Sequence, residues 1–363
     1  MNESSASSEN IIKPSESITA VKYDSKYDIL KFILSLMVLA IHTVLFPMAL
    51  YPWLRIAVPL FFIMSSKFVF SKLNKASPDQ HAKILRGFVL RNLQLYICWF
   101  IILIPITLYV RSSLYFSGNI LQNILNIVRS ILFSSSFIAS WFIMATIIGV
   151  LLIYFLSRVL RKNYLIFIFA LFAFIFVTLA SSYEYVIADT FISSAIKGYI
   201  TIFSELVCSF PAAIFWVFIG KLFAEQKIKI KSTVLWAILT VLSCAALYIE
   251  WRCILHLDGS YSNDSYFMLA PVCILLFIGV EKLKPIYWKP SMHLKRMSTI
   301  IYVSHASLIP IVARVIMFIF HSSSPLLSFT ITLIGCITIY FCIEFAIKLF
   351  QKYRFKKILK MLY

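Results

Sequence analysis

Charged residues are scarce in this chain of 363 residues: they make up 13% of it, whereas 61% of the residues are hydrophobic. Glycine and proline are also few, with 8 and 12 copies, which excludes a collagen-like or low-complexity chain. The mean hydropathy is +0.89, and one soluble core cannot hide so many apolar side chains. The composition therefore predicts an integral membrane protein that crosses the bilayer many times within one domain.

Motifs for metal binding are lacking as well. The seven cysteines lie mostly in apolar segments, with no C-x-x-C pair and no Cys/His ligand spacing. We therefore predict no metal site and interpret the cysteines as small buried side chains. The formal charge of +19 does not indicate nucleic acid, because the basic residues occur in short clusters between apolar runs rather than on one folded face.

The N-terminal segment lacks an apolar run. Residues 1–20 are rich in Ser, Glu and Asn, with no cleavage pattern after a hydrophobic stretch, so a signal peptide is not predicted. We expect a disordered cytoplasmic tail over residues 1–20 and a membrane domain over residues 21–363.

Ten apolar runs follow, each near the length of a membrane-crossing helix or shortened by Pro, Lys or Arg at its edge. The runs lack strand-like alternation, and open sheet edges cannot be satisfied in hydrocarbon, so helices are expected. The runs cover residues 29–50, 56–70, 93–110, 137–156, 164–180, 199–223, 234–249, 266–280, 300–320 and 326–350. The predicted fold class is thus an all-α bundle of about ten transmembrane helices.

The placement of Lys and Arg supports this count. With ten spans, 28 of the 34 basic residues fall on the side that holds both termini, six of them in a loop expected over residues 67–91. Because Lys and Arg accumulate in cytoplasmic segments, both termini are predicted to be cytoplasmic. The segments between runs are too short for a soluble catalytic domain, so any chemistry must use polar residues in or beside the helices.

His42 is the first candidate for chemistry. Lys31 marks the cytoplasmic start of the first run, and His42 follows eleven residues later, about 16 Å along a helix. This depth puts the imidazole in the outer half of the membrane, where it can take a proton from a hydroxyl. Arg55 follows after a short turn and is expected to face the same cavity, where it can hold an oxyanion. The alternatives are a histidine bonded to a neighbouring helix and an arginine that anchors a helix end.

The first two runs also carry ordered motifs. Asp28-x-x-Lys31 is followed by ten residues and His42, and then by Pro59-Leu-Phe-Phe-Ile-Met-Ser-Ser66. This order resembles the acyltransferase 3 family, whose motifs are Asp-x-x-Arg, ten residues and His, then Pro-x-Phe-Phe-x-x-Ser-Gly. Lys31 and Ser66 depart from that pattern, which loses the bidentate geometry of arginine and puts a close backbone approach in doubt. Weaker matches follow in order: Arg91-x-x-Gln94, where the family has a second arginine, Ser140-Trp141-Phe142-Ile143, residues 215–222, and Ile301-Tyr302-Val303-Ser304-His305.

The resemblance implies an enzyme of the bacterial inner membrane. It would transfer an acetyl or other short acyl group from cytoplasmic acyl-CoA, typically acetyl-CoA, to a hydroxyl of a cell-surface or lipid-linked glycan, with His42 as general base. A covalent acyl-histidine is an alternative. The candidate site residues are His42 and Arg55 for catalysis, Lys31, Arg91 and His305 for the coenzyme, and Trp141, Glu250 and Arg252 for the acceptor.

Some assignments stay open. His305 either lines the donor path or bonds a neighbouring carbonyl, and Arg314 is expected to pair with a glutamate as a structural ion pair. The competing functions are a secondary transporter, for which no internal inverted repeat is visible, a polysaccharide polymerase or ligase, and a non-catalytic family member in polysaccharide biosynthesis. The sequence does not identify the acceptor glycan, the acyl group or the oligomeric state.

Overall fold

The protein is seen in a computed structural model that describes residues 24–116, 118–135, 137, 140–203, 206–258, 264–321, 323–350 and 355–363. Within these residues all of the regular secondary structure is helical, as predicted. The tail predicted over residues 1–20 lies outside the described residues. The α-helices are α1 (Lys26–His42), α2 (Tyr51–Leu54), α3 (Ala57–Lys75), α4 (Pro78–Tyr115), α5 (Ile120–Phe133), α6 (Trp141–Val159), α7 (Asn163–Ser181), α8 (Glu184–Ile187), α9 (Phe191–Ile202), α10 (Pro211–Ala224), α11 (Thr233–Asp258), α12 (Leu269–Lys282), α13 (Ser291–Phe320), α14 (Pro325–Leu349) and α15 (Phe355–Leu359), with short 3₁₀ turns η1 (Met48–Leu50), η2 (Leu206–Cys208) and η3 (Lys360–Leu362).

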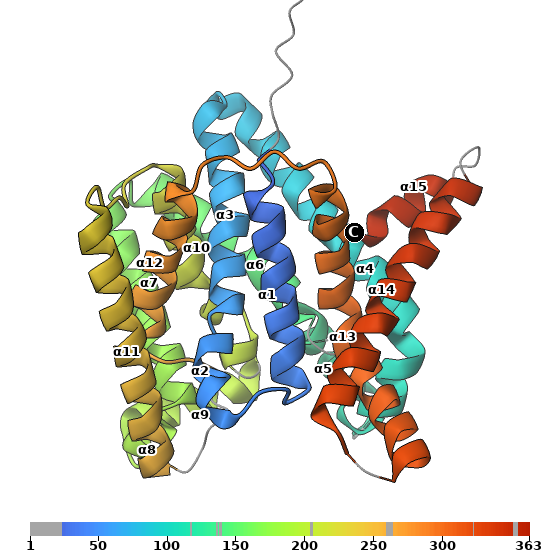
Figure 1. The fold of residues 1–363 in the computed structure, drawn as a ribbon. Helices are drawn as coiled ribbons and strands as arrows, with labels where there is room; N and C mark the ends of the chain where they lie inside the picture. The colour runs from blue at the N-terminus through green and yellow to red at the C-terminus, as the bar shows by residue number, and fades with distance from the viewer. Residues whose placement is uncertain are drawn as a thin grey trace, which may run out of the picture.

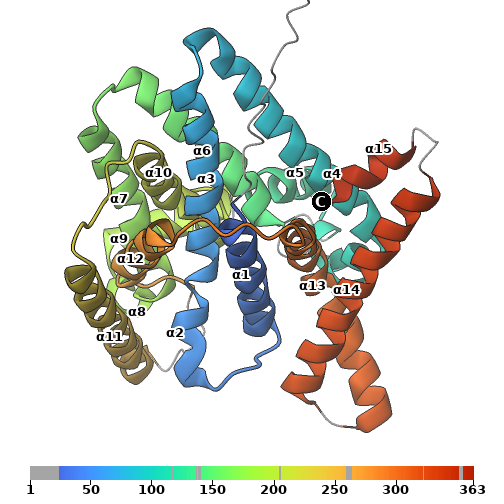
Figure 2. The same cartoon turned by 45° about the horizontal axis from the view of Figure 1, so that its top comes forward.

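The helices form a bundle around α1 and α3, which stand side by side near its centre (Figure 1). The helix α13 packs against α1 and α14, whereas α10 packs against α3, α6 and α7. The linker between α12 and α13 crosses over the ends of α3 and α1 (Figure 2). There the backbone N–H of Ser25 donates to Ile286 O (2.6 Å), which ties the start of α1 to this linker. Trp99 Nε1 donates to Leu362 O (3.0 Å) and so fastens η3 to α4.

Among the described residues, seven helical segments are long and apolar enough to cross a membrane. They are Met48–Lys75, Pro78–Val110, Trp141–Val159, Asn163–Ser181, Thr233–Leu257, Ser291–Phe320 and Pro325–Leu349. The helices α1, α10 and α12 occupy three further predicted runs and have 17, 14 and 14 residues. A helix needs roughly 17 to 25 residues to cross hydrocarbon, so α1 is at the lower limit and α10 and α12 are below it. The count of ten spans and the cytoplasmic placement of both termini therefore stay predictions.

Several helix boundaries differ from the predicted runs. The run over residues 199–223 is not one helix, because α9 ends at Ile202 and α10 begins at Pro211, which has no backbone N–H to continue a preceding helix. The loop expected over residues 67–91 is mostly helical, since α3 continues to Lys75 and α4 begins at Pro78. Lys and Arg end an apolar run without ending a helix, because both are good helix formers.

The helix α1 stops earlier than its apolar run. Its last residue is His42, and Thr43 Oγ1 donates back to Leu39 O (2.9 Å), which closes the final turn. Val44 then adopts a positive φ of 52°, so the chain leaves the helix axis there. His42 therefore lies at the end of a helix rather than in its middle. At this end its side chain can face a cavity.

Candidate active site

His42 lines an internal cavity of about 190 Å³. Its side chain is exposed there, although the neighbours Ile41 and Thr43 are buried. Two other predicted site residues, Arg55 and Trp141, line the same cavity. The structure thus brings together residues from α1, from the turn before α3 and from the start of α6, as the sequence predicted for His42 and Arg55.

His42 has a second histidine beside it. The ring centroids of His42 and His305 lie 5.1 Å apart, and His305 is fully buried. His305 Nδ1 lies 2.8 Å from Ile301 O and 2.9 Å from Tyr302 O. Because carbonyl oxygens only accept, Nδ1 is the nitrogen that carries a proton, and in the neutral ring Nε2 keeps an unshared electron pair. Among the described residues, that buried Nε2 has no hydrogen-bond partner.

This pairing places His305 beside the end of α1 that holds His42, and away from Lys31, where its predicted contact with the coenzyme would lie. The helix α13 begins at Ser291 rather than near residue 300, so His305 sits in the middle of the helix. The sequence prediction allowed a bond to a neighbouring carbonyl, and that bond is present. Its approach to His42 was not predicted, because the two histidines are 263 positions apart in the chain.

Arg55 lies at one wall of the cavity and forms an ion pair with Asp264, a second lining residue. The side chain of Arg55 is 14% exposed and that of Asp264 is 45% exposed, so the pair stands between the cavity and its surroundings. Asp264 comes just before α12 and was not predicted as a site residue. The signal was weak, because an acidic residue in a segment between spans is ordinary.

Aromatic rings make much of the remaining wall. Trp141, Phe62 and Phe142 line the cavity, and the ring centroids of Phe62 and Phe142 lie 4.4 Å apart. Tyr302 joins them, with its ring centroid 5.4 Å from that of Phe142. Such flat apolar surfaces exclude water from a reacting group and strengthen electrostatic interactions inside the cavity. The predicted place of Trp141 in the acceptor site is consistent with this position.

A cluster of cations lies towards the opposite end of α1, the end predicted to be cytoplasmic, and we call it the inner cation cluster: Lys31, Lys72, Arg91 and Lys295. Lys31 interacts electrostatically with Arg91 and Lys295, and Lys295 also interacts with Lys72. Asp28 supplies one compensating carboxylate. Lys31 and Arg91 were predicted as coenzyme contacts, but Lys72 and Lys295 were not, because in sequence they look like any other cytoplasmic basic residue.

Glu250 and Arg252, which were predicted to bind the acceptor, do not line the cavity. Glu250 accepts hydrogen bonds from Tyr183 (2.6 Å) and from the backbone N–H groups of Phe267 and Met268, both at 2.7 Å. These two N–H groups precede α12, so Glu250 caps the positive end of that helix. Arg252 is exposed on α11. Neither residue is among the described residues that line the cavity.

The expected ion pair of Arg314 is wrong for the part of the chain that the structure describes. The guanidinium of Arg314 lies over the ring of Tyr109 at 4.5 Å. Glu344 pairs instead with Arg296 at 2.8 Å, and Glu205 lies outside the described residues. The face of an aromatic ring attracts a cation, so an arginine does not need a carboxylate partner. For this reason, the presence of Arg314 within an apolar run did not identify its partner.

The close backbone approach that Ser66 put in doubt is present. Ser66 is fully buried, and its hydroxyl donates to Phe62 O (2.7 Å). The glycine is on the facing helix: a Cβ added to Gly220 would lie 1.9 Å from Ser66 Oγ and 2.4 Å from Ile63 O. Gly220 therefore allows α10 to pack directly on α3, and α3 carries one wall of the cavity.

The described helices thus place His42, with His305 beside it, and Arg55 at a largely apolar cavity, an arrangement that suits an enzyme. The sequence model of the acyltransferase 3 family, described as an acyltransferase domain, matches residues 24–345. The chain belongs to this family. No curated protein and no solved structure matches it.

Proposed function

We propose that this acyltransferase moves an acetyl group from acetyl-CoA to a hydroxyl of a cell-surface or lipid-linked glycan, with His42 as the general base. The observation that carries the proposal is the position of His42: exposed in the cavity, backed by the buried His305 and accompanied by Arg55. In the reaction, the acceptor hydroxyl attacks the thioester carbonyl while His42 takes its proton. The carbon–sulfur bond then breaks, and the coenzyme thiolate recovers a proton from the imidazolium.

The inner cation cluster supports the choice of donor. Coenzyme A carries phosphates, and cations gathered from α1, α3, α4 and α13 suit them. Lys31 and His42 are eleven positions apart on the same helix, about 16 Å along its axis, a separation that an extended pantetheine arm spans. With phosphates bound at Lys31, Arg91 and Lys295, the thioester is delivered towards the imidazole.

The size of the cavity supports a short acyl group. Its volume is about 190 Å³, below the roughly 300 Å³ at which sites for drug-sized ligands begin. An acetyl group and one hydroxyl-bearing unit of a glycan suit such a space, whereas a long acyl chain does not. The acceptor is therefore expected to present a single unit to His42, with the rest of the polymer outside.

His305 is assigned a positioning role. With its proton held on Nδ1 by two carbonyls, its Nε2 can accept a hydrogen bond from one ring nitrogen of His42. This contact would fix the tautomer of His42 and leave its other nitrogen free to take the acceptor proton, as hydrogen-bond partners of reactive histidines commonly do.

Variants of His305 test this role. We expect His305→Leu to lower kcat by about 10-fold to 100-fold with little change in KM, and His305→Gln to recover part of the loss, because its amide oxygen is an acceptor near the position of Nε2. Turnover is measured at several pH values in protein of matched abundance. Equal activity of the Leu and Gln variants would contradict a hydrogen bond to His42.

Arg55 is assigned the role of donating hydrogen bonds to the thioester carbonyl oxygen, on which negative charge develops during the attack. Arg55→Lys keeps the charge and loses the planar fork of donors that also binds Asp264. We expect kcat to fall by about 10-fold or more, since removing one oxyanion donor costs about 100-fold to 1,000-fold. Steady-state kinetics of acetyl transfer are the measurement, and unchanged kinetics would reduce Arg55 to a structural anchor.

The function itself is tested with inside-out membrane vesicles and acetyl-CoA labelled in the acetyl group. Label that appears in a lipid-linked or surface glycan only when the protein is present supports the proposal. Solute flux that does not need acetyl-CoA would instead support a secondary transporter, and absence of both would favour a non-catalytic family member. Mass spectrometry of surface polysaccharide and peptidoglycan from cells with and without the protein then identifies the acceptor by its lost acyl mass.

A further inference from the structure

A second cavity lies at the inner end of the bundle, well away from His42. Its volume is about 560 Å³, and it is bounded by the end of α3, the linker between α10 and α11, and the end of α12. Five lysines line it. Lys67 pairs with Glu281, and we call the cavity the lysine pocket after the other four: Lys75, Lys229, Lys231 and Lys282. Ser71 and Asn74 add neutral polar groups to the same wall.

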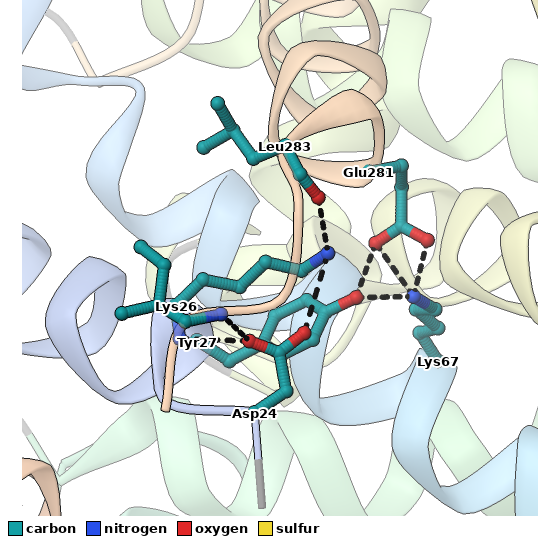
Figure 3. A network of polar contacts seen from close by, with 7 residues as sticks. Asp24, Lys26, Tyr27, Lys67, Glu281 and Leu283 are labelled. Atoms are coloured by element: carbon teal, nitrogen blue, oxygen red, sulfur yellow. Dashed lines mark hydrogen bonds and ion pairs between the residues drawn. The ribbon is translucent and has the colours of Figure 1, made fainter. Parts of the chain in front are cut away.

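The lysine pocket has an excess of positive charge. The carboxylate that lines it, Glu281, already accepts from Lys67 at 2.6 Å and from Tyr27 at 2.6 Å (Figure 3). Lys229 donates to the amide oxygen of Gln226 (2.9 Å), and Lys282 donates to the backbone oxygen of Lys231 (3.2 Å). Among the described residues, none of the four lysines pairs with a carboxylate. A hollow with this charge suits an anion with several acceptor oxygens.

The surroundings of the lysine pocket are those of a membrane interface. Exposed aromatic residues, Tyr287 and Trp288, follow α12 on the linker that crosses this end of the bundle, and such residues mark the headgroup level. On the other side, Val234 and Leu235 at the start of α11 are 71% and 49% exposed. A ligand in the lysine pocket thus meets positive charge at one end and lipid-facing apolar surface at the other.

The lysine pocket is also separate from the inner cation cluster. Lys67, Ser71, Asn74 and Lys75 follow one face of α3 at helical spacing and line the pocket. Phe68 lies on a different face, with its ring 5.8 Å from Lys31 Nζ. The donor site proposed above and the lysine pocket are therefore on different faces of one helix.

We propose that the lysine pocket binds the phosphate headgroup of an anionic phospholipid, with the acyl chains lying along the start of α11. Basic pockets between transmembrane helices bind such headgroups. The bound lipid would join the end of α3 to α12 and to the linker before α11, and so stabilise the helix that carries one wall of the active site.

The test compares wild-type protein with the double variant Lys229→Gln/Lys231→Gln, and uses Lys357→Gln/Lys360→Gln in the C-terminal segment as a control of equal charge loss. Full-length protein is placed in nanodiscs of phosphatidylcholine with or without phosphatidylglycerol. We expect phosphatidylglycerol to raise the unfolding temperature of wild type and control, and to raise that of the pocket variant by less than half as much. The affinity of the pocket variant for phosphatidylglycerol should be about 25-fold lower than that of wild type, since each lysine contributes a factor of about 5 near an anionic headgroup.

Two further arms separate lipid from other anions. Inorganic phosphate or free coenzyme A is added to wild type and to the pocket variant in phosphatidylcholine discs. The proposal is overturned if either anion raises the unfolding temperature of wild type as much as phosphatidylglycerol does and fails to raise that of the pocket variant. Native mass spectrometry of detergent-purified protein gives a readout that does not depend on unfolding. Retained phosphatidylglycerol on wild type and control, but not on the pocket variant, supports the proposal, and equal retention overturns it.

Discussion

His42→Ala is expected to lower acyl transfer by at least about 100-fold, because general base catalysis contributes about 100-fold to 10,000-fold to a rate. The membrane abundance of the variant should stay close to that of wild type. His42 is the last residue of α1 and is exposed in the cavity, so its side chain contributes little to packing. Transfer of labelled acetyl in inverted vesicles and size-exclusion chromatography of the detergent-solubilised protein measure the two quantities.

His256→Ala is the matched control for this prediction. His256 is also an exposed histidine on a membrane helix, but it is on α11 and is not among the described residues that line the cavity. Its variant should retain wild-type transfer. Normal acetylation by His42→Ala would rule out His42 as the base, and label that remains covalently on wild-type protein after denaturation would favour the acyl-histidine route.

Among glycine-to-alanine substitutions in the described core, Gly220→Ala should lower the stability of the protein most. The added carbon would lie 1.9 Å from Ser66 Oγ and 2.4 Å from the backbone oxygen of Ile63, and a backbone oxygen cannot move aside without shifting α3. Overpacking of a close-packed core commonly costs about 1 to 3 kcal/mol, and a contact with backbone belongs at the upper end of that range. Unfolding temperature and yield of monodisperse protein are the measurements.

Gly87→Ala provides the comparison. Gly87 is also in a helix, but a Cβ there meets nothing within 4 Å, and alanine favours a helix over glycine by about 1 kcal/mol. This variant should be as stable as wild type or more stable. If Gly220→Ala were equally well tolerated, the direct packing of α10 on α3 would not be a requirement of the fold.

The helical class and much of the candidate site could be predicted from the sequence. Apolar run length predicts helices because hydrocarbon leaves the backbone few alternatives. The spacing of Lys31 and His42 predicted that they lie about half a bilayer apart on one helix, and both residues lie on α1 as expected. Arg55 and Trp141 share the cavity with His42, since short turns and matching motifs placed them at the same end of neighbouring helices.

Other parts of the site could not be predicted, and the reason is the same in each case. The partner of His42 is His305, the partner of Arg55 is Asp264, and the glycine beside Ser66 is Gly220. Each pair joins residues that are far apart in the chain. Glu250 is a predicted site residue that has a structural role instead. An acidic residue within an apolar run favours a functional interpretation, but its three hydrogen bonds identify it as a helix cap.

The sequence by itself determined that this chain is an all-helical membrane acyltransferase with Lys31 and His42 eleven positions apart on its first helix, because helix periodicity and hydrophobic length are local properties. Only the tertiary structure decided which side chains face one another across helices. Helix packing brings distant positions within a few ångströms, and no local pattern of residues encodes that choice.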